Sequence, residues 1–210
     1  MTQSPGRREL NKTRTRESIV AALRELADDH PLAEITVDQL ADHAGISRRT
    51  FFNYYGSIPA VLSETFAGYA ADLVGAVDRE LFATDPVQAF RSLVAAQGIP
   101  TDFLHWLAVL NCHDTDNEPS VLIERAVWAD LAGWLEGVLV DMLPDGTDPL
   151  YVSTLASGVM GTFSAAEQTW LAGLAGLDRR CAPTAADLHD FNAHLDRALS
   201  YLARGWRPLP

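Results

Sequence analysis

Apolar residues recur at intervals of three and four along almost the whole chain, which is the period of an amphipathic helix. Proline and glycine interrupt this pattern, as at His30-Pro31 and at Pro144-Asp145-Gly146. Residues 1–12 show no period, and we expect a flexible arm there. The pattern predicts an all-α fold of about nine helices, over residues 13–28, 36–44, 47–56, 57–81, 86–97, 102–111, 119–143, 149–176 and 187–203.

The stretch Thr36–Gly56 carries the signals of two short helices joined by a tight turn. Thr36 followed three residues later by Gln39 forms a capping box, in which each side chain satisfies a free backbone N–H of the other. Gly45 can adopt the left-handed conformation that ends a helix without a Cβ clash. These signals predict a pair of helices that cross steeply.

The second helix of the pair, capped by Ser47, has an aromatic side and a polar side. At 100° per residue Phe51 and Tyr55 share one side, and they should point into the core. Two adjacent arginines at the exposed start, Arg48 and Arg49, favour reading of a DNA major groove. An ordinary helical hairpin with solvated arginines is the alternative. The candidate DNA contacts are Arg14, Arg16, Thr36, Ser47, Arg48, Arg49, Thr50, Phe52, Asn53 and Tyr54.

The run GISRRTFFNYYGSIPAVL resembles the recognition helix, and the start of the next helix, in the tetracycline-repressor-like (TetR/AcrR) transcriptional regulators. The resemblance covers about the first quarter of the chain, and the spacing from Thr36 through Gly45 and Thr50 matches without a gap. Two positions depart from it. Phe52 stands where the family commonly has a tyrosine, and Ile58 stands where it commonly has a lysine that contacts phosphate.

The resemblance implies an arm over residues 1–12, a helix-turn-helix DNA-binding domain over 13–57, and an effector-binding and dimerisation domain over 58–210. It implies a homodimer paired through the last two long helices, which binds a palindromic double-stranded DNA operator. Most such proteins are repressors that a small molecule releases from DNA. The long helix predicted over 57–81 would link the two domains mechanically.

The net charge of −12 is unevenly distributed along the chain. The first 56 residues carry eight basic and eight acidic side chains, so the remaining residues hold the entire excess of negative charge. Residues 1–16 alone carry a net charge of +4. A basic arm, a neutral reading head and an acidic body would orient the protein on DNA by their own field. For residues 1–9, a disordered polar segment with incidental charge explains the composition equally well.

Sequence features of other protein classes are weak or lacking. No apolar run reaches 18 residues without a charge and no signal-peptide core is present, so we expect a cytoplasmic protein with no membrane partner. Cys112 and Cys181 are far apart, which fits a reducing compartment. The group His105, Cys112, His113 and Asp114 lacks the paired spacing of a metal site. No catalytic nucleophile or glycine-rich phosphate loop is recognisable, so we expect neither an enzyme nor a cofactor.

Aromatic and polar residues in the helices that surround a ligand cavity in the resembling family are candidate effector contacts. Each aromatic residue alone is better explained by core packing than by ligand contact, but together with the polar residues they suggest an apolar pocket with few polar groups. The rival interpretations are a helical ligand-binding or scaffold protein whose head reads DNA weakly, prompted by Phe52 and Ile58, and a helical enzyme. The candidate effector contacts are Phe103, His105, Trp106, Asn111, Trp128, Thr162, Phe163, Gln168 and Trp170.

Overall fold

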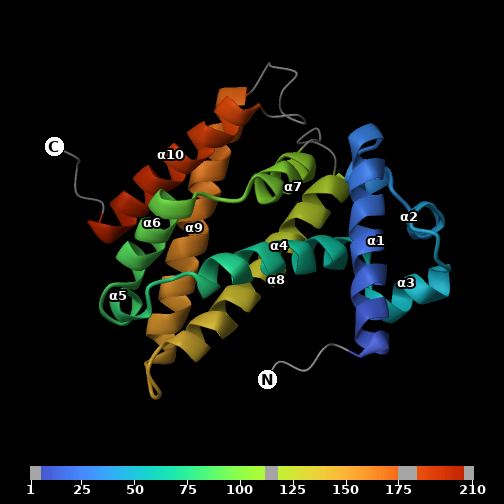
Figure 1. The fold of residues 1–210 in the computed structure, drawn as a ribbon. Coiled ribbons are helices and arrows are strands. Elements are labelled where there is room, and N and C mark those ends of the chain that lie inside the picture. Colours follow the sequence, from blue (N-terminus) through green and yellow to red (C-terminus); the bar gives the residue numbers. More distant parts are fainter. Residues whose placement is uncertain (1–5, 112–117, 175–183, 206–210) are drawn as a thin grey trace.

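The computed structural model describes residues 6–111, 118–174 and 184–205, and in these ranges all regular structure is helical (Figure 1). The fold is therefore all-α, as the sequence predicts. Its elements are α1 (Arg7–Asp29), the 3-10 helix η1 (Leu32–Glu34), α2 (Val37–His43), α3 (Arg48–Tyr54), α4 (Ile58–Gly75), α5 (Arg79–Thr84), α6 (Pro86–Gln97), α7 (Thr101–Asn111), α8 (Glu118–Met142), α9 (Pro149–Leu174) and α10 (Ala185–Ala203).

The first three α-helices and η1 form a unit at one side of the molecule, which we call the head (Figure 1). The predicted capping box is present: Thr36 Oγ1 accepts from the Gln39 amide at 3.2 Å, and Gln39 Oε1 accepts from the Thr36 amide at 2.8 Å. Gly45 has φ of +67°. Ser47 Oγ caps α3 by accepting from the Thr50 amide at 3.0 Å. The core of the head includes Ile19, Leu23, Leu40, Phe51 and Tyr55.

Helix α4 connects the head to the remaining helices, which we call the body. Its N-terminus is capped by Ser57, whose Oγ accepts from the Ala60 amide at 3.3 Å. Its buried side packs against α1, α7 and α8, and Ser63 Oγ donates to Asp130 of α8 at 2.8 Å. The head also contacts the body directly, through an ion pair between Arg24 of α1 and Asp102 of α7 at 3.1 Å. One hydrophobic cluster extends from the head through α4 into the body.

In the body, α10 packs along both α9 and α6, on the side of the molecule away from the head (Figure 1). Arg91 of α6 pairs with Asp196 of α10 at 2.8 Å. Gly98 ends α6 with φ of +69°, and the following amide of Ile99 donates to the Asn192 side chain at 2.8 Å. These contacts hold the turn between α6 and α7 against α10.

Two predicted boundaries are wrong. Helix α1 begins at Arg7, so residues 7–12 of the expected flexible arm are helical, since Arg, Glu, Leu and Lys are good helix formers. Helix α4 ends at Gly75 instead of continuing to residue 81, because Asp78 caps a new helix by accepting from the amides of Glu80 and Leu81, each at 3.0 Å. The described ranges hold ten α-helices, one more than expected.

Candidate nucleic-acid interface and internal cavity

Helix α3 presents its polar side to solvent and its aromatic side to the core of the head. Phe51 and Tyr55 are buried, as predicted, and Arg49 and Asn53 on the opposite side are exposed. Thr50 and Tyr54 lie half-buried on the flanks. Phe52 is an exposed aromatic ring, with 47% of its surface accessible. The geometry leaves one face of α3 available for a groove.

Arg48 at the start of α3 is held by two neighbours. Its Nη1 donates to both carboxylate oxygens of Asp38 on α2, at 3.0 and 2.8 Å. Its guanidinium also lies over the ring of Phe52, 5.6 Å from the centroid, which is a cation–π contact. The predicted site residue Arg48 is therefore exposed but not free.

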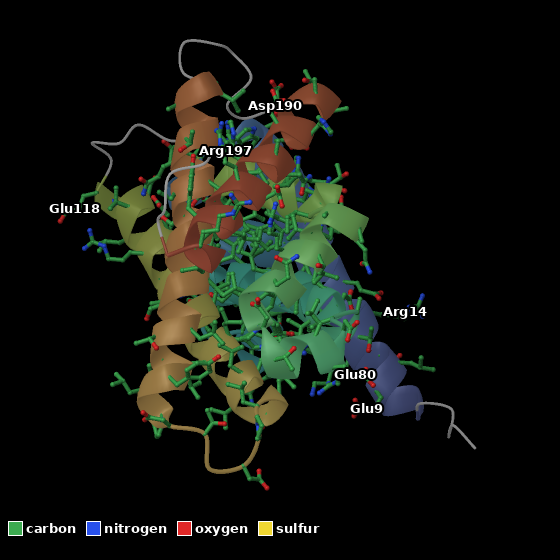
Figure 2. All side chains as sticks on the ribbon, turned by 90° about the vertical axis from the view of Figure 1, so that its left-hand side faces the viewer. Glu9, Arg14, Glu80, Glu118, Asp190 and Arg197 are labelled. Carbon is green, nitrogen blue, oxygen red and sulfur yellow. The ribbon has the colours of Figure 1, made fainter. Side chains whose placement is uncertain are left out.

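The two candidate arginines of α1 occupy different environments. Arg14 is exposed and extends away from the helices (Figure 2). Arg16 pairs with Glu64 of α4 at 2.6 Å and lies over the ring of Tyr55 at 5.8 Å. Burial, with Glu64 nearby, raises the pKa of Tyr55 to about 12. In this structure Arg16 joins α1 to α4, and its contact with DNA stays a prediction.

Ile58, at the first turn of α4, does not face solvent. Only 7% of its surface is accessible, and it belongs to the same hydrophobic cluster as Val61 and Leu62. In this structure the side chain at position 58 therefore packs into the core and does not lie at the protein surface. This hydrophobic cluster favours an apolar side chain at position 58.

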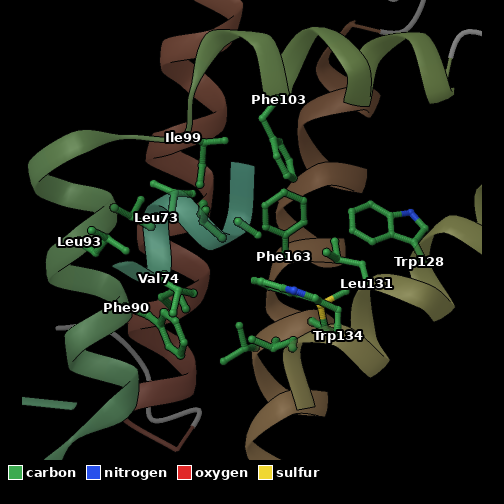
Figure 3. Close-up of a pocket in the computed structure, with 17 residues that line it drawn as sticks. Leu73, Val74, Phe90, Leu93, Ile99, Phe103, Trp128, Leu131, Trp134 and Phe163 are labelled. Carbon is green, nitrogen blue, oxygen red and sulfur yellow. The ribbon is translucent and has the colours of Figure 1, made fainter. Parts of the chain in front are cut away.

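A cavity of about 120 Å³ lies between α4, α6, α7, α8, α9 and α10. Aromatic rings from α7, α8 and α9 face aliphatic side chains from α4 and α6 across it (Figure 3). Every lining side chain is apolar apart from the indole nitrogens of two tryptophans, so the wall favours apolar contents. The lining residues are Ala70, Leu73, Val74, Phe90, Leu93, Val94, Ile99, Phe103, Trp128, Leu131, Trp134, Leu135, Val159, Met160, Phe163, Leu195 and Leu199.

Three of the nine candidate effector contacts line this cavity, namely Phe103, Trp128 and Phe163. The other six are outside its lining, and their contact with an effector stays a prediction: His105, Trp106, Asn111, Thr162, Gln168 and Trp170. Their surroundings give the reasons why they lie outside the lining. Gln168 is exposed, Thr162 Oγ1 donates to the Gly158 carbonyl at 2.7 Å, and Trp170 Nε1 donates to the Asp187 carbonyl at 2.7 Å.

Sequence reasoning missed the contribution of α4, α6 and α10 to the cavity. Leu73 and Leu199, for example, lie on the apolar stripes of their helices. The helical period shows that such residues are buried, but it carries no signal that distinguishes a cavity wall from close-packed core. The signal could only come from the packing of all six helices together.

A buried carboxyl group was also missed. Glu167 of α9 has only 2% of its surface accessible, and its Oε1 accepts a hydrogen bond from Asn111 Nδ2 at 2.8 Å. Burial raises the pKa of Glu167 to about 8, with Glu124 adding to the rise and the Asn111 hydrogen bond opposing it. At neutral pH this side chain is largely uncharged.

Metal sites and membrane spans are two other possibilities for these residues. Among the described residues no three His, Cys, Asp or Glu side chains gather as a metal site would require. Cys112, His113, Asp114 and Cys181 lie outside the described ranges. Across the same ranges no single helix has the length and hydropathy of a membrane span. Helices α6 and α7 have that length and hydropathy only when taken together, and they are bent by 103° at the break between them.

Helices α2 and α3, with the turn at Gly45 between them and an exposed basic start on the second, define a helix-turn-helix nucleic-acid-binding unit. Residues 19–65 match the family described as "Bacterial regulatory proteins, tetR family". Over these residues the head is similar to the DNA-binding part of the tetR family.

One stretch of the chain is similar to curated regulators. It is 53% identical over 45 residues to the HTH-type transcriptional regulator EthR of Mycobacterium tuberculosis and of Mycobacterium bovis. This match spans 21% of our chain and 21% of the length of each relative.

Two solved structures are similar over most of the chain. One is Thermus thermophilus FadR, a TetR-family transcriptional repressor in complex with lauroyl-CoA, with a TM-score of 0.48, 24% identity, and coverage of 93% of this chain and 96% of that one. The other is a transcriptional regulator from Rhodococcus sp. Rha1, with a TM-score of 0.47, 18% identity, and coverage of 93% and 99%.

Proposed function

We propose that this protein is a sequence-specific DNA-binding transcriptional regulator. The observation that carries the proposal is the exposed face of α3, with Arg49 and Asn53 pointing away from a core formed by Phe51 and Tyr55. An α-helix fits the major groove, where arginine can form two hydrogen bonds to guanine and asparagine two to adenine. The family of the head supports this assignment.

We further propose the division of labour that the sequence suggests, with residues 58–210 serving effector binding and dimerisation. Helix α9 exposes a row of small residues on one side, which includes Gly161 and Ala165. Small residues let a second helix approach closely, and α10 packs against α9. A twofold dimer would place two heads on half-sites about 34–36 Å apart, and the operator would be palindromic. Such a regulator works in the cytoplasm, where the DNA is.

The apolar cavity is the proposed effector site. Its wall offers almost no polar partner, so a charged group inside it would remain unpaired at a large cost in free energy. The ligand is therefore a small apolar molecule, or the apolar part of an amphipathic one. Sites for such ligands commonly enclose roughly 300–1,000 Å³, so a ligand that enters must push the lining helices apart. Because α4 lines the cavity and carries the head, this expansion would change the position of the head and release DNA, as in a repressor.

The decisive experiment is selection of genomic DNA fragments by the purified full-length protein, followed by titration of the enriched fragment against a scrambled one. We expect enrichment of palindromic fragments and tighter binding to them. A protein that binds an apolar ligand but enriches no fragment would instead be the helical ligand-binding or scaffold protein. Catalytic turnover of a bound ligand would indicate an enzyme.

A further inference from the structure

The proposed reading surface contains an acidic side chain in direct contact with an arginine that should read DNA. Asp38 lies in the first turn of α2 and Arg48 in the first turn of α3, and each side chain has 62% of its surface accessible. One guanidinium nitrogen of Arg48 donates to both oxygens of Asp38, at 3.0 and 2.8 Å. A carboxylate at this surface repels phosphate, so its presence there calls for an explanation.

The other side of Arg48 is closed by Phe52. The guanidinium lies 5.6 Å from the centroid of this ring. The ring itself is fixed by an edge-on contact with buried Phe51, at 5.4 Å between centroids. Arg48 is thus held between a carboxylate and an anchored aromatic ring, which restricts its rotamers.

Two neighbours lack these restraints and provide internal comparisons. Arg49, the next residue, forms no ion pair or ring contact with any described residue. Asp42 carries the same charge as Asp38 on the same helix, and its side chain forms no hydrogen bond or ion pair with any described residue. The pairing of Asp38 with Arg48 is therefore specific to these two positions.

We propose that Asp38 is a positioning residue that holds Arg48 against Phe52 and thereby increases discrimination between operator and unrelated DNA. The inference rests on the proposed DNA-binding function. Asp38 occupies only Nη1 of Arg48, but its charge offsets that of the guanidinium. A phosphate that approaches the remaining N–H groups is therefore repelled by the carboxylate, and one that replaces Asp38 exchanges one charge-assisted pair for another and gains little. A base edge within reach of the fixed guanidinium gains a contact without that exchange, because the side chain is already ordered.

The test compares the full-length wild type with Asp38→Asn, the matched control Asp42→Asn, Arg48→Ala, and the double variant Asp38→Asn/Arg48→Ala. Each is titrated with the selected operator and with a scrambled duplex at several salt concentrations. Asp38→Asn should tighten binding to scrambled DNA about 2- to 30-fold for a dimer, beyond the change in Asp42→Asn, since exposed ion pairs contribute modestly. Its salt slope should steepen by up to about 1.8, for one newly neutralised phosphate per subunit.

Operator affinity should change less than affinity for scrambled DNA, so the specificity ratio falls. In the Arg48→Ala background, Asp38→Asn should behave like Asp42→Asn. The inference is overturned if Asp38→Asn equals Asp42→Asn on both duplexes, or if its effect persists without Arg48. Circular dichroism checks that all variants keep the helicity of the wild type.

A measurement without DNA separates this inference from the proposed function. Side-chain ¹⁵N relaxation of the arginine Nε groups should show Arg48 ordered and Arg49 mobile in the wild type, and Arg48 mobile in Asp38→Asn. Equal mobility of the two arginines in the wild type overturns the inference alone. Failure of the wild type to prefer any DNA, with Arg48 ordered, overturns the proposed function and leaves Asp38 without a role in discrimination.

Discussion

The side-chain amide of Asn111, at the end of α7, donates a hydrogen bond to the buried carboxyl of Glu167 on α9, at 2.8 Å. Asn111 Nδ2 also donates to the Leu107 carbonyl at 2.8 Å, so the amide joins two helices through a single group. Asn111 is uncharged, so it does not offset the cost of burying an ionised carboxylate at Glu167. The free energy of unfolding therefore depends on pH.

Glu167→Gln should stabilise the protein at alkaline pH and leave it unchanged in acid. Below pH 4.5 the carboxyl of Glu167 is protonated in both the folded and the unfolded state. Between pH 4.5 and about pH 8 it ionises only in the unfolded state, so the free energy of unfolding falls as pH rises. Above about pH 8 the loss is complete, and it amounts to at most about 5 kcal/mol. Glutamine keeps an acceptor for Asn111 without titrating. Urea unfolding between pH 4 and 9 measures the difference.

The matched control is Glu17→Gln, which removes an exposed carboxylate from α1. It should shift stability by no more than about 0.5 kcal/mol at any pH. A constant difference between Glu167→Gln and wild type across this pH range would show that Glu167 does not titrate as described.

Arg49→Ala should weaken operator binding by about 1–3 kcal/mol per subunit if Arg49 contacts a guanine with two hydrogen bonds. Its exposed position and lack of an ion pair with any described residue mean that folding should be unaffected. Fluorescence anisotropy with a labelled operator measures the loss. Arg79→Ala, on α5 and remote from the head, is the control (Figure 1). Equal operator affinities of the two variants would show that Arg49 does not contact the operator.

Ile58→Lys should destabilise the protein by about 1–3 kcal/mol, because it places an ammonium group where only 7% of the residue surface is accessible. Ile58→Val keeps an apolar side chain and should cost about 0.5–1.5 kcal/mol. Urea unfolding compares the three proteins. The salt slopes of DNA binding should be parallel for wild type and Ile58→Lys. A steeper slope with unchanged stability would instead place position 58 against the DNA backbone.

A series of n-alkanols should bind with affinity that rises by about 0.8 kcal/mol per methylene until the cavity is filled. The matching alkanoate anions should bind more weakly, since the apolar wall offers them no ionic partner. Trp128 and Trp134 line the cavity, so their fluorescence reports occupancy. Ala70→Leu, inside the lining, should shorten the longest alkanol that binds, whereas the exposed control Ala83→Leu should not.

Alkanol binding and operator binding should oppose one another. A coupling of about 1–3 kcal/mol is typical, and reciprocity requires the operator to weaken alkanol binding by the same factor. Titration of the alkanol with and without operator measures it. Identical alkanol affinities in the two titrations would mean that the cavity has no regulatory role.

Gly161→Arg should convert the dimer into a monomer and leave the subunit folded. A Cβ at Gly161 meets no other atom within 4 Å, and the same holds for Gly133 on α8. Arginine also favours the helix over glycine by roughly 0.5–1 kcal/mol, so folding is not impaired. Sedimentation at micromolar concentration should therefore show a monomer for Gly161→Arg and a dimer for Gly133→Arg. A dimer in both would place the interface elsewhere.

Local signals in the sequence were sufficient for α2, α3 and the turn between them. The caps at Thr36 and Ser47, the turn at Gly45 and the inward side of Phe51 all depend on neighbours within a few residues. The same logic failed at the end of α4. Val77 and Phe82 are buried against α6 and α8–α9, and this tertiary packing, with the cap at Asp78, outweighs the continuous apolar seam.

The candidate sites were predictable only in part, because they depend on which side chains contact one another in the folded chain. Arg48 and Asp38 are ten residues apart, and only the folded turn brings them into contact. Likewise Asn111 and Glu167 are 56 residues apart, and in the sequence each is an ordinary polar residue of a helix. Of the polar residues predicted as effector contacts, Asn111 and Thr162 donate to backbone carbonyls of their own helices, at 2.8 and 2.7 Å.

The end of α4 at Gly75 makes this helix a lever arm. Its 18 residues span about 27 Å, with cavity-lining Ala70, Leu73 and Val74 near one end and the head attached at the other. A tilt of about 5° at the cavity end would carry the head about 2.4 Å sideways over that length. With two subunits tilting in opposite senses, the heads would separate by about 5 Å, a large misfit for half-sites about one helical turn apart. A molecule that expands the cavity slightly would thus change the distance between the two α3 helices that contact DNA.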